Sequence, residues 1–316
     1  MLKQTQNNIS IIGIDVSKDK LDVHCYDNKH KICIQNNKKS IVKLIKDVSK
    51  NLVNPLFIME STGGYEKLAQ NLINDANYNV HIAHPLRIHY FAKQKGLFAK
   101  TDRLDAAIIA QYGIQENVKP TPAPSKLSVE LKELASRRTQ LIDLVTKEKC
   151  RVKSHQSNEM NRSLKRVIKA IEAEIELLNQ KISKKLSQSP EHNKKVELLQ
   201  TVKGIGEITA HSLVCLLPEL GTLSRAKIAC LCGLAPKNKD SGIKTGKRHI
   251  NGGRFNVRKA LYMAAVCAST HNPKMREFYQ KLKNKGKESK VALTAVMRKL
   301  IITINAMLRD EKEWAF

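Results

Sequence analysis

Aromatic side chains, acidic side chains and long apolar runs are all scarce in this sequence. Phenylalanine, tryptophan and tyrosine make up 4% of the 316 residues, and tryptophan occurs once. No apolar run approaches the roughly 18 residues of a membrane span, and the polar start, MLKQTQNNIS, is unlike a secretion signal. We therefore expect a soluble, cytoplasmic protein without a membrane partner.

Cysteine is present, but not in a metal-binding pattern. The seven cysteines are scattered and none forms a CxxC pair. Cys230 and Cys232 have no second ligand pair at zinc-site spacing. We expect reduced thiols, most of them in the core.

Acidic residues are outnumbered by basic ones, 29 to 56, which gives a formal net charge of +27. The hydrophobic fraction of 41% excludes a wholly disordered chain despite this charge. Residues 1–120 carry 17 basic and 11 acidic side chains, whereas the remaining 196 residues carry 39 and 18. This asymmetry favours a polyanion partner, with nucleic acid as the leading candidate. A basic amphipathic membrane helix competes, but its bulky apolar anchors are scarce.

The N-terminal part of the chain has the pattern of a mixed α/β domain. Apolar or alternating segments predict strands at 9–16, 21–26, 31–35, 56–59 and 80–83. Helical spacing predicts helices at 40–50 (behind a serine cap), 64–76, 85–95 and 101–112. The order β-β-β-α-β-α-β-α is that of the ribonuclease-H-like fold, whose sheet brings the ends of the first and fourth strands together.

Three prolines, at 120, 122 and 124, mark a domain boundary. Beyond it, 126–150 and 163–186 predict two long amphipathic helices that form a hairpin or coiled-coil arm. Further helical segments are predicted at 196–234, 254–270 and 290–308. We expect an α/β domain (1–124), a helical arm (125–190) and a mostly helical C-terminal domain (191–316).

Four acidic residues fall where this fold would bring them together. Asp15 ends the first strand and Glu60 ends the fourth, while Asp102 and Asp105 share one face of a predicted helix. Carboxylates packed together need cations, and hard oxygen ligands favour Mg²⁺ or Mn²⁺. Two such ions can clamp the attacking and leaving oxygens of a phosphodiester. The four positions therefore predict a metal site for phosphodiester chemistry.

Each of these acids also has an ordinary interpretation, since an Asp after a strand is typical of a turn and Asp102 would suit a helix cap. Their joint placement favours the metal site. Three other carboxylates are alternatives, but they are less readily brought to the same site, because they lie in a predicted turn, a strand centre and a helix: Asp19, Asp22 and Glu66. Lys100 and Arg103 flank Asp102; they either contact phosphate or belong to a solvated helix face.

The segment LQTVKGIGEITAHSL (199–213) has the pattern of a helix-hairpin-helix. Gly204 and Gly206 would let backbone N–H groups, with Lys203 beside them, approach a phosphate without reading base sequence. The alternative is a plain turn between two helices.

Residues 237–259 combine four glycines with eight basic residues and one acid, Asp240. Glycine beside cations lets a backbone pass close to phosphates, whereas a solvated loop would explain the charge alone. The candidate phosphate contacts in this segment are Lys244, Lys247, Arg248, Arg254 and Arg258. Ser241 could attack a phosphodiester if a base or a metal activated it. By residue type alone, however, a Ser-Gly pair is more typical of a turn.

Six motifs carry a family resemblance: GIDVSKDKLDV (13–23), MESTGGYE (59–66), KTDRLDA (100–106), VKGIGEITA (202–210), LCGLAP (231–236) and SGIKTGKRHINGGRFNVRKALYMAA (241–265). In order and spacing they resemble the DEDD-type insertion-sequence transposases, also called bridge-RNA-guided recombinases, which have Piv-type DNA invertases as relatives. The resemblance covers nearly the whole chain.

The resemblance implies a RuvC-like N-terminal domain whose DEDD tetrad is Asp15, Glu60, Asp102 and Asp105. It also implies a C-terminal transposase domain whose nucleophile is Ser241, a Mg²⁺ cofactor and a prokaryotic, nucleoid-associated setting. In such enzymes a structured non-coding RNA pairs with target and donor DNA. The two domains of different subunits form a composite site in a homo-oligomer, a dimer or tetramer.

The expected chemistry is strand cleavage and exchange through a phosphoserine link to DNA, with Arg248, Arg254 and Arg258 as candidates for stabilising charge at the phosphate. Within enzymes, the alternative is a RuvC-type metal-dependent nuclease in which water attacks. A non-catalytic nucleic-acid-binding protein is the alternative of a different class, and it leaves the carboxylates unexplained.

Overall fold

The computed structural model describes residues 9–52, 54–97, 102–154, 157–238, 240, 246 and 248–314, with the backbone only at 51 and 102–104. The chain divides into two compact units, Met1–Ala123 and Pro124–Phe316. The division falls within the segment that contains the three prolines. The second unit holds both the long helices and the C-terminal helices.

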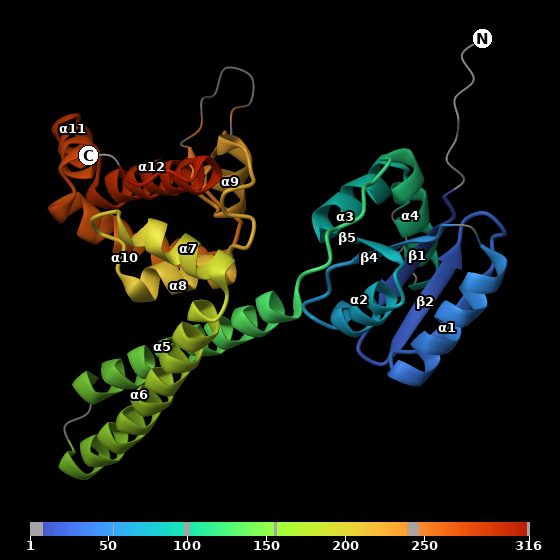
Figure 1. The fold of residues 1–316 in the computed structure, drawn as a ribbon, viewed down its shortest axis with the longest axis horizontal. Helices are drawn as coiled ribbons and strands as arrows, with labels where there is room; N and C mark the ends of the chain where they lie inside the picture. Colours follow the sequence, from blue (N-terminus) through green and yellow to red (C-terminus); the bar gives the residue numbers. More distant parts are fainter. Residues whose placement is uncertain are drawn as a thin grey trace. The chain divides into compact units, whose positions relative to one another are not determined.

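The first unit is built on a five-stranded sheet with the order β3-β2-β1-β4-β5. Its strands are β1 (Ile11–Val16), β2 (Lys20–Cys25), β3 (Lys31–Gln35), β4 (Leu56–Glu60) and β5 (Asn79–Ala83). The strands β1, β2 and β3 are antiparallel neighbours, whereas β4 runs parallel to both β1 and β5. This mixed α/β sheet has the strand order of the predicted ribonuclease-H-like fold, with β1 beside β4 (Figure 1).

Helices cover both faces of this sheet. They are α1 (Lys38–Asn51), α2 (Glu66–Asp75), α3 (Pro85–Gln94) and α4 (Asp102–Gln115). Successive strand residues point to opposite faces, so Ile12 and Ile14 lie in one core with residues of α1 and α2, and Ile11 lies in another with residues of α3 and α4. The helix α1 begins earlier than predicted, because Asn37 rather than Ser40 caps it: the Asn37 side chain accepts a hydrogen bond from the Ser40 N–H (2.9 Å).

Two glycines let α4 lie directly on the sheet. A Cβ at Gly13 of β1 would collide with the Ala106 carbonyl oxygen and the Ala110 nitrogen of α4. A Cβ at Gly113 of α4 would collide with the side chain of Ile58 in β4 and crowd that of Ile11. Ile11, at the start of β1, therefore lies against Gly113 near the end of α4, and Gly13 lies against residues 106–110. The helix runs antiparallel to the strand.

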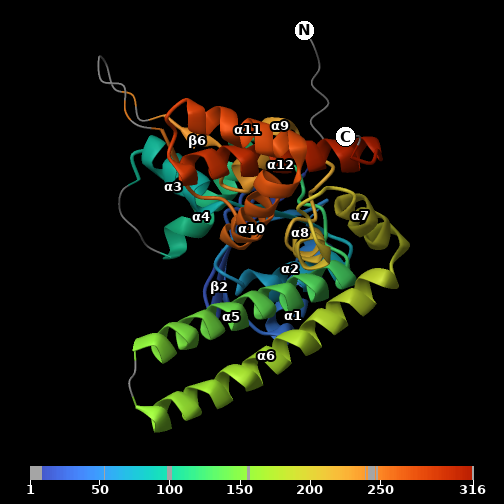
Figure 2. The same ribbon diagram turned by 90° about the vertical axis from the view of Figure 1, so that its left-hand side faces the viewer.

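A helical hairpin opens the second unit. It consists of α5 (Lys126–Ser154) and α6 (Asn158–Ser187), and the two helices lie side by side in both views (Figures 1 and 2). Buried Leu141 and Val145 of α5 and Ile168 and Leu178 of α6 form its apolar seam. The predicted arm is thus present as a hairpin. α6 begins five residues before the predicted 163, where Ser157 caps it by accepting a hydrogen bond from the Met160 N–H.

Six helices form the body of the second unit. They are α7 (Pro190–Gln200), α8 (Glu207–Leu216), α9 (Arg225–Leu231), α10 (Phe255–His271), α11 (Pro273–Asn284) and α12 (Ser289–Asp310). A short ribbon of β6 (Pro236–Lys237) and β7 (His249–Ile250) follows α9. The core of this body extends to Leu131 and Ile182 at the base of the hairpin, and Trp314 packs against it. The helix α11 was not predicted.

The helix α12 corrects the expectation that no segment approaches a membrane span. By length and mean hydropathy it would suffice to cross a bilayer. In the structure it is a core helix instead: Val296, Leu300 and Ile304 are fully buried, together with residues of α8 and α10. Its apolar character is explained by packing inside the second unit.

Fewer of the seven cysteines are buried than expected. Cys25, Cys215 and Cys232 are buried, whereas the other four are exposed. Burial raises the pKa of the Cys215 thiol and of the Cys232 thiol to about 12, so these two remain protonated and unreactive.

Candidate active site and nucleic-acid interface

Asp15 and Glu60 lie side by side at one edge of the sheet. In the parallel pairing of β1 with β4, Ile14 is opposite Met59, and Asp15 and Glu60 are the next residues on the two strands. Gly13 of β1 and Ile58 of β4 contact α4. Because every second residue of a strand points to the same face, Asp15 and Glu60, two positions further on, also face α4. Both carboxylate residues are half-buried. The strand pairing thus brings together two acids that are 45 residues apart in the sequence.

The first turn of α4 lies at the same edge. Two residues of a strand span about the same length along the chain axis as four residues of a helix. Since Gly13 faces Ala106 and Ala110, the register places Asp15 opposite the start of α4. That start contains Asp102, the first residue of the helix, and half-buried Asp105. The Asp102 side chain lies outside the described residues, and so do the Arg103 side chain and the whole of Lys100.

The donor set at this edge consists of carboxylates only. Hard oxygen donors of this kind suit Mg²⁺ or Mn²⁺ and not a soft metal. Among the side chains that the structure describes, no three His, Cys, Asp or Glu residues form a group that could hold a metal ion. Asp15, Glu60 and Asp105 alone therefore do not form such a group, and a metal site at this edge would need a further ligand such as Asp102 at the start of α4.

Two of the alternative carboxylates have defined contacts of their own. Glu66 accepts hydrogen bonds from the N–H groups of Thr62 (3.1 Å) and Gly64 (2.8 Å), which closes the loop before α2. Burial raises the pKa of Glu66, but these hydrogen bonds outweigh it and lower the pKa below its ordinary value. Asp22 is opposite Asp15 in the β1–β2 pairing, and its carboxylate lies 3.6 Å from the Lys20 ammonium.

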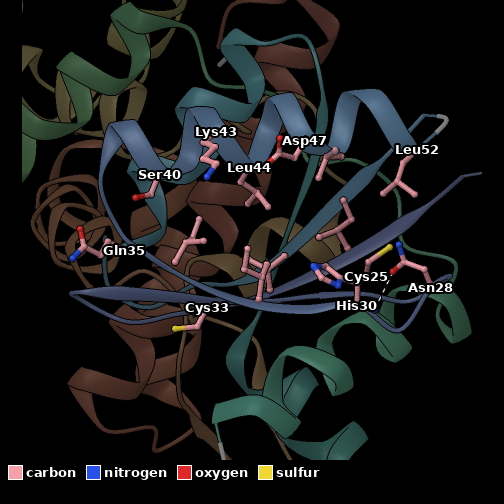
Figure 3. Close-up of a pocket in the computed structure, with 15 residues that line it drawn as sticks. Cys25, Asn28, His30, Cys33, Gln35, Ser40, Lys43, Leu44, Asp47 and Leu52 are labelled. Atoms are coloured by element: carbon pink, nitrogen blue, oxygen red, sulfur yellow. Dashed lines mark hydrogen bonds between the residues drawn. The ribbon is translucent and has the colours of Figure 1, made fainter.

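A cavity of about 210 Å³ borders Ala106 of α4 and is lined by Asp22, His24, Lys31 and Cys33 of β2 and β3. His24 is buried, and both its burial and the nearby Lys31 charge lower its pKa. A larger cavity, about 480 Å³, lies between β2, β3 and α1, where Leu44 of α1 points toward the strands (Figure 3). It opens on the face of the sheet that α1 covers, so it lies away from the carboxylates.

The predicted helix-hairpin-helix is a tight turn between α7 and α8. Gly204 has φ +110°, and a Cβ there would lie 2.7 Å from the Cβ of Ala268 in α10. Gly206 precedes α8 with nothing within 4 Å of an added Cβ. Gly204 is therefore required for packing, and only Gly206 leaves its backbone open. Lys203 is exposed beside the turn, and its carbonyl accepts a hydrogen bond from Asn272.

The basic segment is described only in part. Ser241, Lys244 and Lys247 lie outside the described residues, and Arg248 is exposed next to β7. Arg254 forms a bidentate ion pair with Glu219, with both contacts at 2.5 Å, and also donates to the Leu216 carbonyl (3.1 Å). These contacts give Arg254 a role in holding the start of α10 against the loop after α8.

Arg258 is also bound to the fold. It donates to the carbonyl oxygens of Gly252 (2.7 Å) and Gly233 (3.4 Å), and its guanidinium lies 5.5 Å from the centre of the Phe255 ring. Sequence reasoning missed Glu219, because nothing near Arg254 in the sequence indicates a partner 35 residues earlier. It also missed Asp143 of α5, which forms an ion pair with Lys259 of α10.

The sheet order and the two acids on adjacent strand ends define a ribonuclease-H-like domain, and sequence comparisons identify the family. A family model described as a transposase of the DEDD, IS110 type matches residues 12–158, and one described as "Transposase IS116/IS110/IS902 family" matches residues 196–280. The chain belongs to the IS110/IS116 family of insertion-sequence transposases. It is accordingly an enzyme of DNA transposition or recombination.

Relatives cover this chain to different extents. It is 32% identical to the pilin gene-inverting proteins of Moraxella lacunata and Moraxella bovis, over 95% of this chain and 96% of each relative. It is 30% identical over 121 residues to an uncharacterized protein of insertion element IS116 from Streptomyces clavuligerus, which is 37% of this chain and 30% of that protein.

Among solved structures, Thermus thermophilus RuvC in complex with a Holliday junction substrate aligns with 36% of this chain and 99% of its own. The identity is 12% and the TM-score 0.27. A second RuvC structure aligns at 11% identity with the same TM-score. Because this score is low, the fold assignment rests on the strand order and pairing.

Proposed function

We propose that this transposase cuts and rejoins DNA strands by a Mg²⁺-dependent reaction in which Ser241 becomes covalently linked to DNA. The observation that supports the proposal best is the placement of Asp15 and Glu60 on adjacent strand ends, facing the turn of α4 that begins with Asp102 and includes Asp105. Carboxylates contributed by two adjacent strand ends and by the first turn of a helix would suit two divalent ions.

In this proposal the carboxylates hold the cofactor and Ser241 supplies the nucleophile. Mg²⁺, or Mn²⁺, would polarise the scissile phosphate and lower the pKa of the attacking hydroxyl. The Ser241 oxygen bonds to phosphorus as its proton leaves, and the bond from phosphorus to the departing DNA oxygen breaks as that oxygen takes up a proton. Attack by the hydroxyl of a partner strand reverses these changes, so exchange needs no ATP.

The family resemblance extends the proposal to partners. A structured guide RNA would choose target and donor DNA by base pairing, leaving the protein to hold backbones by charge and shape. The composite site would use the first unit of one subunit and the second unit of another, in a dimer or tetramer. The protein would act in the prokaryotic cytoplasm, at the nucleoid.

Copurification with sequencing of the retained RNA, followed by recombination assays with matched DNA and Mg²⁺, tests the proposal. Wild-type protein should yield a covalent protein–DNA adduct that resists denaturation. Ser241→Ala should abolish the adduct, and Asp15→Asn or Glu60→Gln should abolish cleavage while leaving DNA binding intact. Asp19→Asn, an exposed acid in the β1–β2 turn, is the matched control and should retain activity.

Two outcomes would overturn the proposal in different ways. Cleavage by the Ser241→Ala chain without an adduct would favour the RuvC-type nuclease, in which water attacks. Unchanged DNA rearrangement by the Asp15→Asn and Glu60→Gln chains would remove the metal site.

A further inference from the structure

The helix α10 exposes three large apolar side chains on one face. Phe255 is 63% exposed, Tyr262 40% and Met263 62%. Their spacing, i, i+7 and i+8, places them on one stripe of the helix. The opposite stripe, which includes Val257 and Leu261, is buried in the core of the second unit. The exposed stripe, Phe255, Tyr262 and Met263, is called the α10 face below.

The surroundings of the α10 face are basic. Residues 248–271 contain no Asp or Glu. The Arg258 guanidinium lies over the Phe255 ring at 5.5 Å from its centre, which is cation–π geometry. Lys259 forms an ion pair with Asp143, so the middle of α5 reaches this part of α10 through these two side chains.

An exposed apolar stripe marks a site of interaction, and its charge setting indicates the partner. Only 14 residues of the chain are aromatic, and two of them are placed on this stripe. An acidic partner is favoured, because the Arg258 guanidinium lies over the Phe255 ring and residues 248–271 contain no Asp or Glu. Single-stranded nucleic acid combines a polyanionic backbone with flat apolar bases that stack on aromatic rings.

We propose that the α10 face is a stacking platform for unpaired nucleobases, with the positive charge of Arg258 beside Phe255 attracting the phosphates. The inference rests on the proposed function in that the partner is a nucleic acid; it adds that the strand bound here is unpaired. A duplex hides the faces of its bases within its own stack, so it offers these rings nothing to stack on except at its ends. Unpaired bases are available in RNA loops and in separated DNA strands.

The test compares the affinity of the full-length chain for three probes: a short unstructured RNA, the DNA strand of the same sequence, and the matching duplex. Phe255→Ala combined with Tyr262→Ala should weaken binding of single strands by about tenfold or more, because stacking on each ring contributes about 1–3 kcal/mol. Duplex binding should change less than about twofold, and the salt dependence should stay the same, because no phosphate contact is removed.

Two further variants separate stacking from other roles. Phe255→Trp with Tyr262→Trp should restore binding, while Phe255→Leu with Tyr262→Leu, which keeps the apolar surface, should not. Tyr90→Ala is the matched control, since Tyr90 is also 63% exposed but lies on α3 in the first unit. Thermal unfolding should confirm that each variant folds, as the substituted side chains are exposed.

Equal losses for RNA and DNA would support a platform that accepts any unpaired base, and a loss for RNA alone would support a platform that selects RNA. Equal loss for single strands and duplex, or full binding by the leucine variant, would overturn the inference. These measurements need neither Mg²⁺ nor cleavage. If the alanine variant binds normally while wild-type protein still forms the adduct, the inference fails and the proposed function stands.

Discussion

Among single residues, Arg254 and Glu219 form a well-defined polar contact beside the basic segment. Their bidentate pair is partly exposed, with side-chain exposures of 31% and 36%. Although burial raises the pKa of Glu219, hydrogen bonding and the charge of Arg254 outweigh it and lower the pKa below 4.5. The ionised form is therefore favoured by folding.

Glu219→Gln should destabilise the second unit by about 1 kcal/mol at neutral pH, a figure reduced because water partly screens the pair. A carboxylate with a lowered folded-state pKa contributes stability above its unfolded pKa and loses it as the pH falls through the folded value. The difference in melting temperature between wild type and variant, about 2–4 °C, should shrink below pH 4.5. A constant difference down to strongly acidic pH would contradict this assignment.

Residue-level prediction from sequence succeeded where the fold supplies the geometry. Asp15 and Glu60 were expected together because each ends a strand that a ribonuclease-H-like sheet places beside the other, and the β1–β4 register does so. The two arginines Arg248 and Arg254 look alike in the sequence, but Arg248 is exposed whereas Arg254 is paired with Glu219. The sequence does not reveal this difference, because Glu219 is distant in the chain. Ser241 could be selected only through the family resemblance.

At the scale of elements, strong periodicity predicted the strands, the hairpin and most helices. The helix α11 was missed because no helix was predicted between residues 270 and 290, although Asn272 and Pro273 are a cap and a first-turn proline. The Asn272 side chain accepts a hydrogen bond from the Met275 N–H, which starts the new helix. Such local signals are overlooked when the apolar pattern around them is weak.

The turn between α7 and α8 allows the two glycines to be distinguished. Gly204→Ala should lower the melting temperature strongly, since φ is +110° and the new Cβ would lie within 2.8 Å of three atoms of Ala268. Gly206→Ala, with an ordinary φ of −85° and open space around it, should fold normally. If the turn binds phosphate, Gly206→Ala should weaken DNA binding alone. Equal stability of the two variants would refute the packing role of Gly204.

For the whole molecule, charge governs affinity. The net charge is +27, and most of the excess lies in the second unit. DNA binding should weaken by about a thousandfold as salt rises from about 50 to 200 mM, because each neutralised phosphate releases counterions. Filter binding over a salt series measures this, with a neutral polymer as the control ligand. An affinity independent of salt would show that the basic half does not contact the backbone.

Trp314 is the chain's one tryptophan, and it belongs to the second unit, where its backbone N–H donates to the Thr201 hydroxyl. Its indole fluorescence therefore reports on the unfolding of that unit and does not report on the sheet that carries the carboxylates. The far-UV circular dichroism signal comes from the helices of both units. Comparing the two signals during a denaturant titration reveals, without any label, whether the halves of this transposase melt together or one after the other.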